Sequence, residues 1–148
     1  MTRDEASRKM RVRIILTVGL AISVIASPSF AVEECHGGNR AARNVTCVVD
    51  GDTIWQSGVK MRLLEIDAPE TFGASCARER LVGNAAKARL IELMAGGYRV
   101  EDSGGKDRTS DRRELVRVTL KDGRDAGLVL MSEGLAQRWP NKGNRWCD

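Results

Sequence analysis

The pattern of apolar and polar residues along the chain predicts several short strands separated by turns. The stretch 45–49 is rich in β-branched residues and ends at Asp50-Gly51, a dipeptide typical of tight turns. Two further apolar stretches lie on either side of a second turn at Ser57-Gly58, and the later one ends before Pro69, because proline cannot donate to a strand ladder. The predicted strands cover 45–49, 53–55, 59–66, 98–101 and 115–120.

Two other stretches have the spacing of helices. Between residues 78 and 94, one helical face carries Val82, Ala86, Leu90 and Leu93. Glycines 96 and 97 are expected to end this helix. A shorter helix is predicted over 125–132 with an aspartate N-cap, and the polar stretch 103–110 is predicted to be a loop. This order predicts an α+β fold, mainly β, and a five-stranded, partly open barrel with one long and one short helix would fit it.

The first 31 residues have the organisation of an export signal. Four basic residues between Arg8 and Arg13 precede an apolar region of 12 residues at 14–25, and Ser29-Phe30-Ala31 matches a cleavage site. The apolar run is shorter than the roughly 20 residues that cross a bilayer. A buried core helix is the alternative, but it does not explain the charged flank. We predict a signal peptide over 1–31 and one secreted or periplasmic domain over 32–148.

Removal of this segment changes the charge of the protein. The whole chain has a net charge of +4, from 24 Lys+Arg and 20 Asp+Glu. Residues 1–31 contain five of the basic and two of the acidic residues, so the predicted domain has 19 and 18, a net charge of +1. The composition therefore does not require a large basic surface, and any contact with nucleic acid must come from local clusters.

All four cysteines lie in the predicted domain, an even number that suggests two disulfides in an exported protein. Three pairings are possible. In one of them Cys35 with Cys47 would tether the N-terminus to the first strand, and Cys76 with Cys147 would tie the C-terminus to the loop after Glu70. Zinc binding is the alternative, although the close Cys/His spacing typical of zinc sites is absent from the sequence.

Acidic residues gather where two predicted strands end. Asp52 follows the first turn and Asp67 comes directly after the third predicted strand, so that two carboxylates from two strand ends could bind one hard divalent cation. The carbonyl of Ala68, held extended by Pro69, is a third candidate ligand. Two Asx turns at hairpin ends would be the purely structural interpretation.

The same region offers groups for phosphodiester hydrolysis. Glu70 is the candidate general base for an attacking water. Arg62 is the candidate for binding the phosphate and stabilising the charge of the transition state. A second arginine is expected from Arg112-Arg113, which precedes the strand at 115–120. The single histidine, His36, lies far from this region and supports no histidine-based mechanism.

These motifs resemble the staphylococcal nuclease family. The resemblance rests on Asp-Gly-Asp-Thr-Ile at 50–54, on the segment 62–71, on 115–118 and on 128–136, and it spans roughly 46–139. It implies an OB-fold barrel with helices and Ca²⁺-dependent hydrolysis of DNA and RNA to 3′-phosphorylated products. It also implies Asp52, Asp67 and the Ala68 carbonyl as calcium ligands and Arg62 and Glu70 as catalytic residues, with Asp50 near the metal.

One departure from the family pattern concerns the second arginine. The family usually has Tyr-Gly between its Asp-Lys/Arg and this arginine, whereas here Arg113 directly follows Asp111-Arg112. Arg113 keeps the spacing to Leu115, so we assign the catalytic role to it. We expect a monomeric, calcium-dependent nuclease. The alternatives are an OB-fold nucleic-acid-binding module with weak or no cleavage, and an exported interaction or structural domain stabilised by disulfides.

Overall fold

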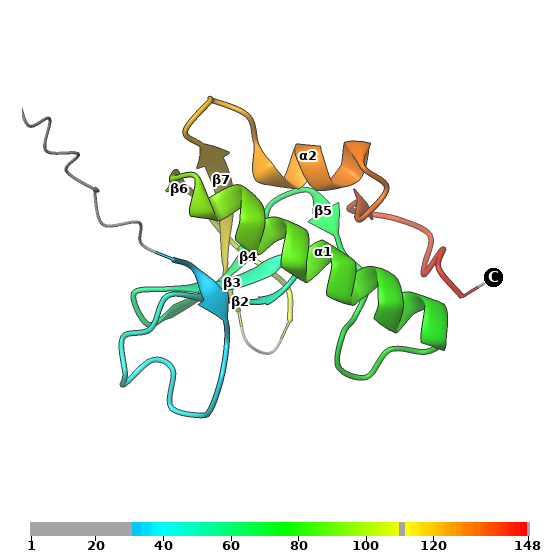
Figure 1. Cartoon of the computed structure of the whole chain (residues 1–148), viewed down its shortest axis with the longest axis horizontal. Helices are drawn as coiled ribbons and strands as arrows, with labels where there is room; N and C mark the ends of the chain where they lie inside the picture. The colour runs from blue at the N-terminus through cyan, green and yellow to red at the C-terminus, as the bar shows by residue number, and fades with distance from the viewer. Residues whose placement is uncertain (1–30, 110–111, 148) are drawn as a thin grey trace, which may run out of the picture.

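Strands make up most of the regular structure in the computed structural model, which describes residues 31–109 and 112–147 (Figure 1). Within these residues there are eight strands and two helices. The strands are β1 (Glu33–Glu34), β2 (Cys47–Asp50), β3 (Thr53–Gln56), β4 (Val59–Leu63), β5 (Ile66–Asp67), β6 (Tyr98–Lys106), β7 (Glu114–Leu120) and β8 (Gln137–Arg138). The helices are α1 (Ala77–Ala95) and α2 (Ala126–Ser132). The predicted α+β class with one long and one short helix is confirmed.

Six strands form one sheet in the order β1-β2-β3-β4-β7-β6, and β5 pairs with β8 in a separate two-stranded sheet. The neighbours β2, β3 and β4 are antiparallel, as are β6 and β7, whereas β1 with β2 and β4 with β7 are parallel. Among the described residues no strand pairing joins the edge strands β1 and β6, so the sheet is not a closed barrel. The partly open barrel expected from the sequence therefore stays a prediction.

The turn between β3 and β4 forms as predicted. Ser57 and Gly58 both have positive φ, of 47° and 77°, the conformation of the two-residue turns that match the twist of a hairpin. The pairing of Gln56 with Val59 directly flanks this turn and sets Thr53 opposite Arg62 further along the hairpin. This register decides which polar side chains meet at the far end.

Two predicted strand boundaries are wrong. The stretch 59–66 is two strands, because the chain turns at Glu65, where φ is 63°, and leaves the large sheet so that β5 can pair with β8. Strand β6 continues through much of the predicted loop 103–110: a bulge between Asp102 and Gly105 interrupts its pairing with β7, which resumes as far as Lys106.

Helix α1 lies across strands β2 to β4 in Figure 1, with α2 beside it, and packs against β2 and α2. Its buried face differs from the prediction, since Val82 is only partly buried and Gly83 is buried in its place. Cys76 caps its N-terminus, and Asp125 caps α2 as predicted, accepting a hydrogen bond from the backbone of Leu128. The core between helices and sheet contains Val48, Ile54, Leu63, Ile66, Leu90, Leu93, Met94, Val116, Val118, Leu120, Val129 and Leu130.

Both cysteine pairs form disulfides, Cys35–Cys47 and Cys76–Cys147, with Cα atoms 4.9 Å and 5.7 Å apart. Of the three possible pairings the structure thus selects one, and it leaves no thiol for the zinc site considered above. Two disulfides indicate an oxidising, extracellular type of environment. Within the described residues, no helix has the length and apolar character to cross a membrane. The predicted signal peptide lies outside the described residues, except for Ala31.

Candidate active site

Asp52 lies at the centre of the site, in the turn between β2 and β3. The turn fits closely against α1, because a Cβ atom on Gly51 would lie 2.7 Å from the Cβ of Ala86 and 2.8 Å from the Cβ of Ala68. Only glycine leaves room for this approach. The backbone amide of Asp52 donates to the carboxylate of Asp50 at 3.2 Å, and Asp52 itself is only 4% exposed.

Three groups hold the Asp52 carboxylate. The hydroxyl of Thr53 donates to Oδ1 at 2.9 Å, and the backbone N–H of Ala68 donates to Oδ2 at 3.1 Å. The Arg62 guanidinium lies 3.0 Å from the same Oδ2. The hairpin register sets Arg62 opposite Thr53. Because Thr53 directly follows Asp52 in the chain, Arg62 also reaches Asp52.

Arg62 also contacts Asp67, the second candidate metal ligand. Its Nη2 atom lies 3.1 Å from Asp67 Oδ1, and the same nitrogen makes the 3.0 Å contact with Asp52. The two carboxylate oxygens therefore lie within about 6 Å of each other. One positive charge thus stands between two carboxylates from different strands.

The other oxygen of Asp67 is held by residues that the sequence did not indicate. Gln137 Nε2 and Asn141 Nδ2 donate to Asp67 Oδ2 at 3.0 Å and 2.8 Å. Both follow Asp67 by 70 residues or more. They reach it because β8 pairs with β5, which sets Gln137 directly opposite Asp67. A two-residue strand of this kind has no recognisable pattern in the sequence.

Arg113, and not Arg112, is directed toward the site. Its Nη1 donates to the hydroxyl of Thr53 at 3.0 Å, so that it connects through Thr53 to the Asp52 carboxylate. Asp107 fixes the side chain by accepting from Nε at 2.6 Å and from the backbone N–H of Arg113 at 2.9 Å. Arg112 is exposed and has a left-handed backbone, with φ of 44°.

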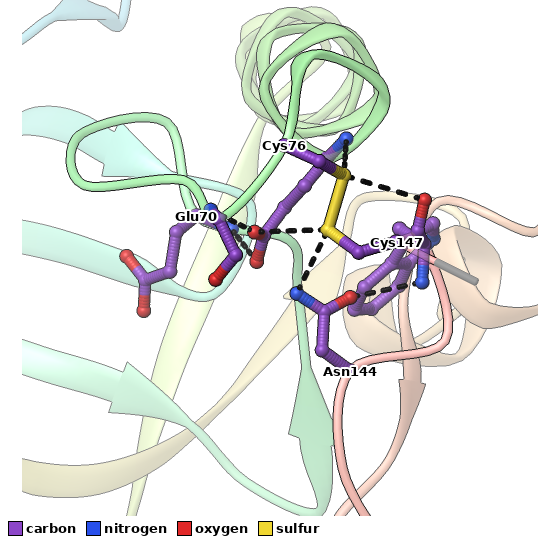
Figure 2. Close-up of a disulfide and its surroundings, with 7 residues drawn as sticks. Glu70, Cys76, Asn144 and Cys147 are labelled. Carbon is purple, nitrogen blue, oxygen red and sulfur yellow. Dashed lines mark hydrogen bonds between the residues drawn. A yellow bond between two sulfur atoms is a disulfide. The ribbon is translucent and has the colours of Figure 1, made fainter.

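Glu70 has a partly exposed side chain, and its backbone contacts α1 at two residues, Glu79 and Gly83. Its N–H donates to Glu79 of α1 at 3.4 Å. A Cβ atom on Gly83 would lie 2.7 Å and 2.9 Å from the carbonyl oxygens of Pro69 and Glu70, so α1 packs directly on this segment. In Figure 2 the carboxylate of Glu70 points away from the Cys76–Cys147 disulfide. Gly83 and Glu79 carry no motif that would have identified them in the sequence.

The site contains more negative charge than Arg62 balances. Burial, and then repulsion from Asp50, raises the pKa of Asp52 to about 7, although Arg62 acts in the opposite direction. Burial is also the main reason why the pKa of Asp50 is raised. The pKa of Glu70 is raised by burial and then by the charge of Asp52. A cluster of acids with raised pKa values is characteristic of functional sites.

This donor set fits a hard cation. Asp52 and Asp67 offer carboxylate oxygens, the ligands that such cations prefer, and their charge is only partly compensated by Arg62. Elsewhere in the described residues, three possible ligand atoms lie within 4.8 Å of one another at Cys76, Glu79 and Cys147. The two sulfurs of that group form a disulfide and are not thiolates, so this second group is a poor metal site.

Trp139 borders the site and was not expected there. It is 51% exposed, and its ring centroid lies 5.9 Å from the Cζ atom of Arg62. Its backbone N–H donates to the carbonyl of Glu65 at 2.9 Å, which holds the residue beside the turn between β4 and β5. The site thus combines acids, two arginines and one exposed aromatic ring.

The structure brings together Asp52, Arg62, Asp67, Arg113 and the backbone N–H of Ala68, with Glu70 on the adjoining segment. No model of a known protein family matches the chain, and no curated protein shows significant similarity to it. Its function must therefore be inferred from the chemistry of this site and from the resemblance carried by its motifs.

Proposed function

We propose that this protein is an exported, cation-dependent phosphodiesterase that hydrolyses DNA, RNA or both. The observation that carries the proposal is the position of Arg62 between Asp52 and Asp67, at 3.0 Å and 3.1 Å, with Arg113 joined to Asp52 through Thr53. Two arginines converge on a buried acidic cluster, an arrangement that a purely structural turn does not need. The six-stranded sheet would then be a variant of the partly open OB-fold barrel.

Each residue has a defined role in the proposed reaction. Water attacks phosphorus, and the carboxylate of Glu70 takes the proton as the new P–O bond forms. The raised pKa of Glu70 brings its basicity closer to neutral pH, as a general base requires. Arg62 and Arg113 stabilise the negative charge on the five-coordinate phosphorus. The bond to the leaving oxygen then breaks, and that oxygen takes a proton from solvent.

We assign the cation site to Asp52, Asp67 and the Ala68 carbonyl, and the cation to Ca²⁺. A cation held there supplies positive charge beside the scissile phosphate. A cation would offset both the desolvation of Asp52 and the repulsion from Asp50 that raise its pKa, which supports a cation site, and the resemblance to calcium-dependent nucleases supports Ca²⁺. We expect the protein to act as a monomer.

The substrate class is inferred from the surroundings of Arg62. A guanidinium group binds phosphate in a forked geometry, and the half-exposed Trp139 ring beside it offers a surface for a nucleobase. Stacking on an aromatic ring does not discriminate strongly between bases or sugars. This supports a nuclease without narrow sequence preference.

The proposal is tested by the release of acid-soluble nucleotides from single-stranded DNA and RNA, with Ca²⁺ and with EDTA. Glu70→Gln and Arg62→Ala should each abolish most of the activity. Matched controls are Glu92→Gln, on the exposed face of α1, and Arg99→Ala, whose side chain is 64% exposed on β6. Activity that is absent from the wild type, or that survives both site substitutions, would reject the mechanism.

A second function is favoured by one specific observation. Arg62 is engaged with two carboxylates and Arg113 with Asp107 and Thr53, so both arginines already have partners within the protein. An OB-type module that binds nucleic acid and cleaves it weakly, or not at all, would tolerate this. Fluorescence anisotropy with a labelled oligonucleotide, followed by gel analysis, separates the two, because a binding module forms a complex without product.

A further inference from the structure

The chain returns to the site after α2 in a segment that ends at the second disulfide. We call residues 137–147 the C-terminal strap. It begins with β8, which pairs with β5, continues past Asn141 and the buried Trp146, and ends at Cys147, which is bonded to Cys76. Cys76 caps the N-terminus of α1, so the far end of the strap is fastened to that helix.

The beginning of the strap holds Asp67. Gln137 and Asn141 both donate to Oδ2 of this carboxylate, at 3.0 Å and 2.8 Å, while Arg62 contacts Oδ1. The strap also closes on itself, since Gln137 Nε2 donates to the carbonyl of Gly143 at 3.1 Å and the Gly143 N–H donates to Asn141 Oδ1 at 2.9 Å. The two amide side chains are thus themselves oriented, and they orient Asp67.

The end of the strap covers Glu79, which in turn holds the backbone of Glu70. Glu79 is 4% exposed and accepts hydrogen bonds from the N–H groups of Ser75 and Glu70, at 2.6 Å and 3.4 Å. The sulfur of Cys147 lies 3.6 Å from its Oε2 atom, and the Cys76–Cys147 disulfide lies beside Asn144 in Figure 2. Because Glu79 is buried beside the end of the strap, its hydrogen bonds to the segment bearing Glu70 are stronger than they would be in water.

We propose that the C-terminal strap is a positioning element that orients both Asp67 and Glu70, and that the Cys76–Cys147 disulfide is required for this function. The proposal rests on the phosphodiesterase function proposed above. Asn141 in the strap and Glu79 in α1, which the strap contacts, are the positioning residues: each acts through another side chain or backbone group and neither is expected to contact the substrate. Outer groups of this kind typically change metal affinity or activity by about 10- to 100-fold when they are removed.

The two disulfides provide a matched pair of variants. Cys76→Ser/Cys147→Ser releases the strap, whereas Cys35→Ser/Cys47→Ser removes a disulfide that joins β2 to the residue after β1, away from these contacts. Both are compared with wild type at a temperature well below all unfolding midpoints.

We expect the first variant, Cys76→Ser/Cys147→Ser, to lower kcat by about 10- to 100-fold and to raise the Ca²⁺ concentration for half-maximal activity by a similar factor. KM for single-stranded DNA should change by less than about threefold, and the second variant should match wild type. Equal losses in both variants, or full activity in the first, would overturn the proposal.

A readout independent of catalysis accompanies these measurements. Hydrogen exchange at the backbone amides of Glu70 and Ser75 should accelerate at least about tenfold in Cys76→Ser/Cys147→Ser and in Glu79→Ala. Glu79→Gln keeps only one of the two acceptor oxygens, so exchange should accelerate at only one of these amides. Asn141→Ala, which leaves both disulfides intact, should weaken calorimetric Ca²⁺ binding by about tenfold. Unchanged exchange and unchanged Ca²⁺ affinity would refute positioning by the strap. A wild-type protein without nuclease activity would instead refute the proposed function, and faster exchange in the variants would still show that the strap orders the segment.

Discussion

Replacement of Gly83 by alanine sets two opposing effects against each other. In the middle of a helix such a change normally stabilises a protein by about 1 kcal/mol, because glycine loses more backbone entropy on folding. At this position the new Cβ would lie 2.7 Å from the carbonyl oxygen of Pro69 and 2.9 Å from that of Glu70, whereas ordinary contacts begin at 3.4 Å. Overpacking of this kind costs roughly 1–3 kcal/mol. We therefore expect Gly83→Ala to lower the free energy of unfolding by up to about 2 kcal/mol.

The same contact has a consequence for catalysis. The segment from Pro69 to Glu70 must retreat from α1 by roughly half an ångström to restore ordinary contact distances. Since a misplacement of about 1 Å can cost on the order of 100-fold in rate, we expect kcat to fall by about tenfold, with KM nearly unchanged.

Urea unfolding and steady-state cleavage of single-stranded DNA would measure the two effects on Gly83→Ala. The control is Asn84→Ala, at the neighbouring exposed position of α1, which should leave kcat within about twofold of wild type. A Gly83→Ala protein that is about 1 kcal/mol more stable than wild type and fully active would show that α1 does not constrain the Glu70 segment.

Substitutions at three further positions test other parts of the site. Burial raises the pKa of Asp52 from 3.8 to about 7, so ionised Asp52 opposes folding increasingly as the pH rises across this range, by an amount on the order of 4 kcal/mol. In EDTA, wild type should therefore lose more stability than Asp52→Asn between about pH 4 and pH 7 in urea unfolding, and parallel pH profiles would contradict this. Asp107→Asn should lower kcat about tenfold by loosening Arg113, which it contacts at 2.6 Å, and an unchanged kcat would mean that this contact does not position the arginine. Trp139→Ala should raise KM for single-stranded DNA about tenfold while Trp139→Phe raises it much less, and equal KM values in wild type and both variants would exclude stacking on this ring.

Local signals in the sequence predicted the helices well. The long helix was expected over 78–94 and is Ala77–Ala95, because its apolar face and the glycines at 96 and 97 are local features. Strands depended more on distant partners. The break between β4 and β5 and the short strand β8 follow from the pairing of β5 with β8, two elements about 70 residues apart. A two-residue strand has too few positions to show an alternating pattern.

The sequence by itself determined which chemical groups are available: acids and Arg62 within 50–70, an arginine before β7, and an even number of cysteines. These are properties of residue type and short spacing. Only the tertiary structure decided that Arg62 bridges Asp52 and Asp67, and that Arg113 rather than Arg112 reaches Thr53. It alone showed that Gln137 and Asn141 hold Asp67. Hydrogen bonds and ion pairs act over about 3 Å, and distances of that order between residues far apart in the chain are set by the packing of the whole domain.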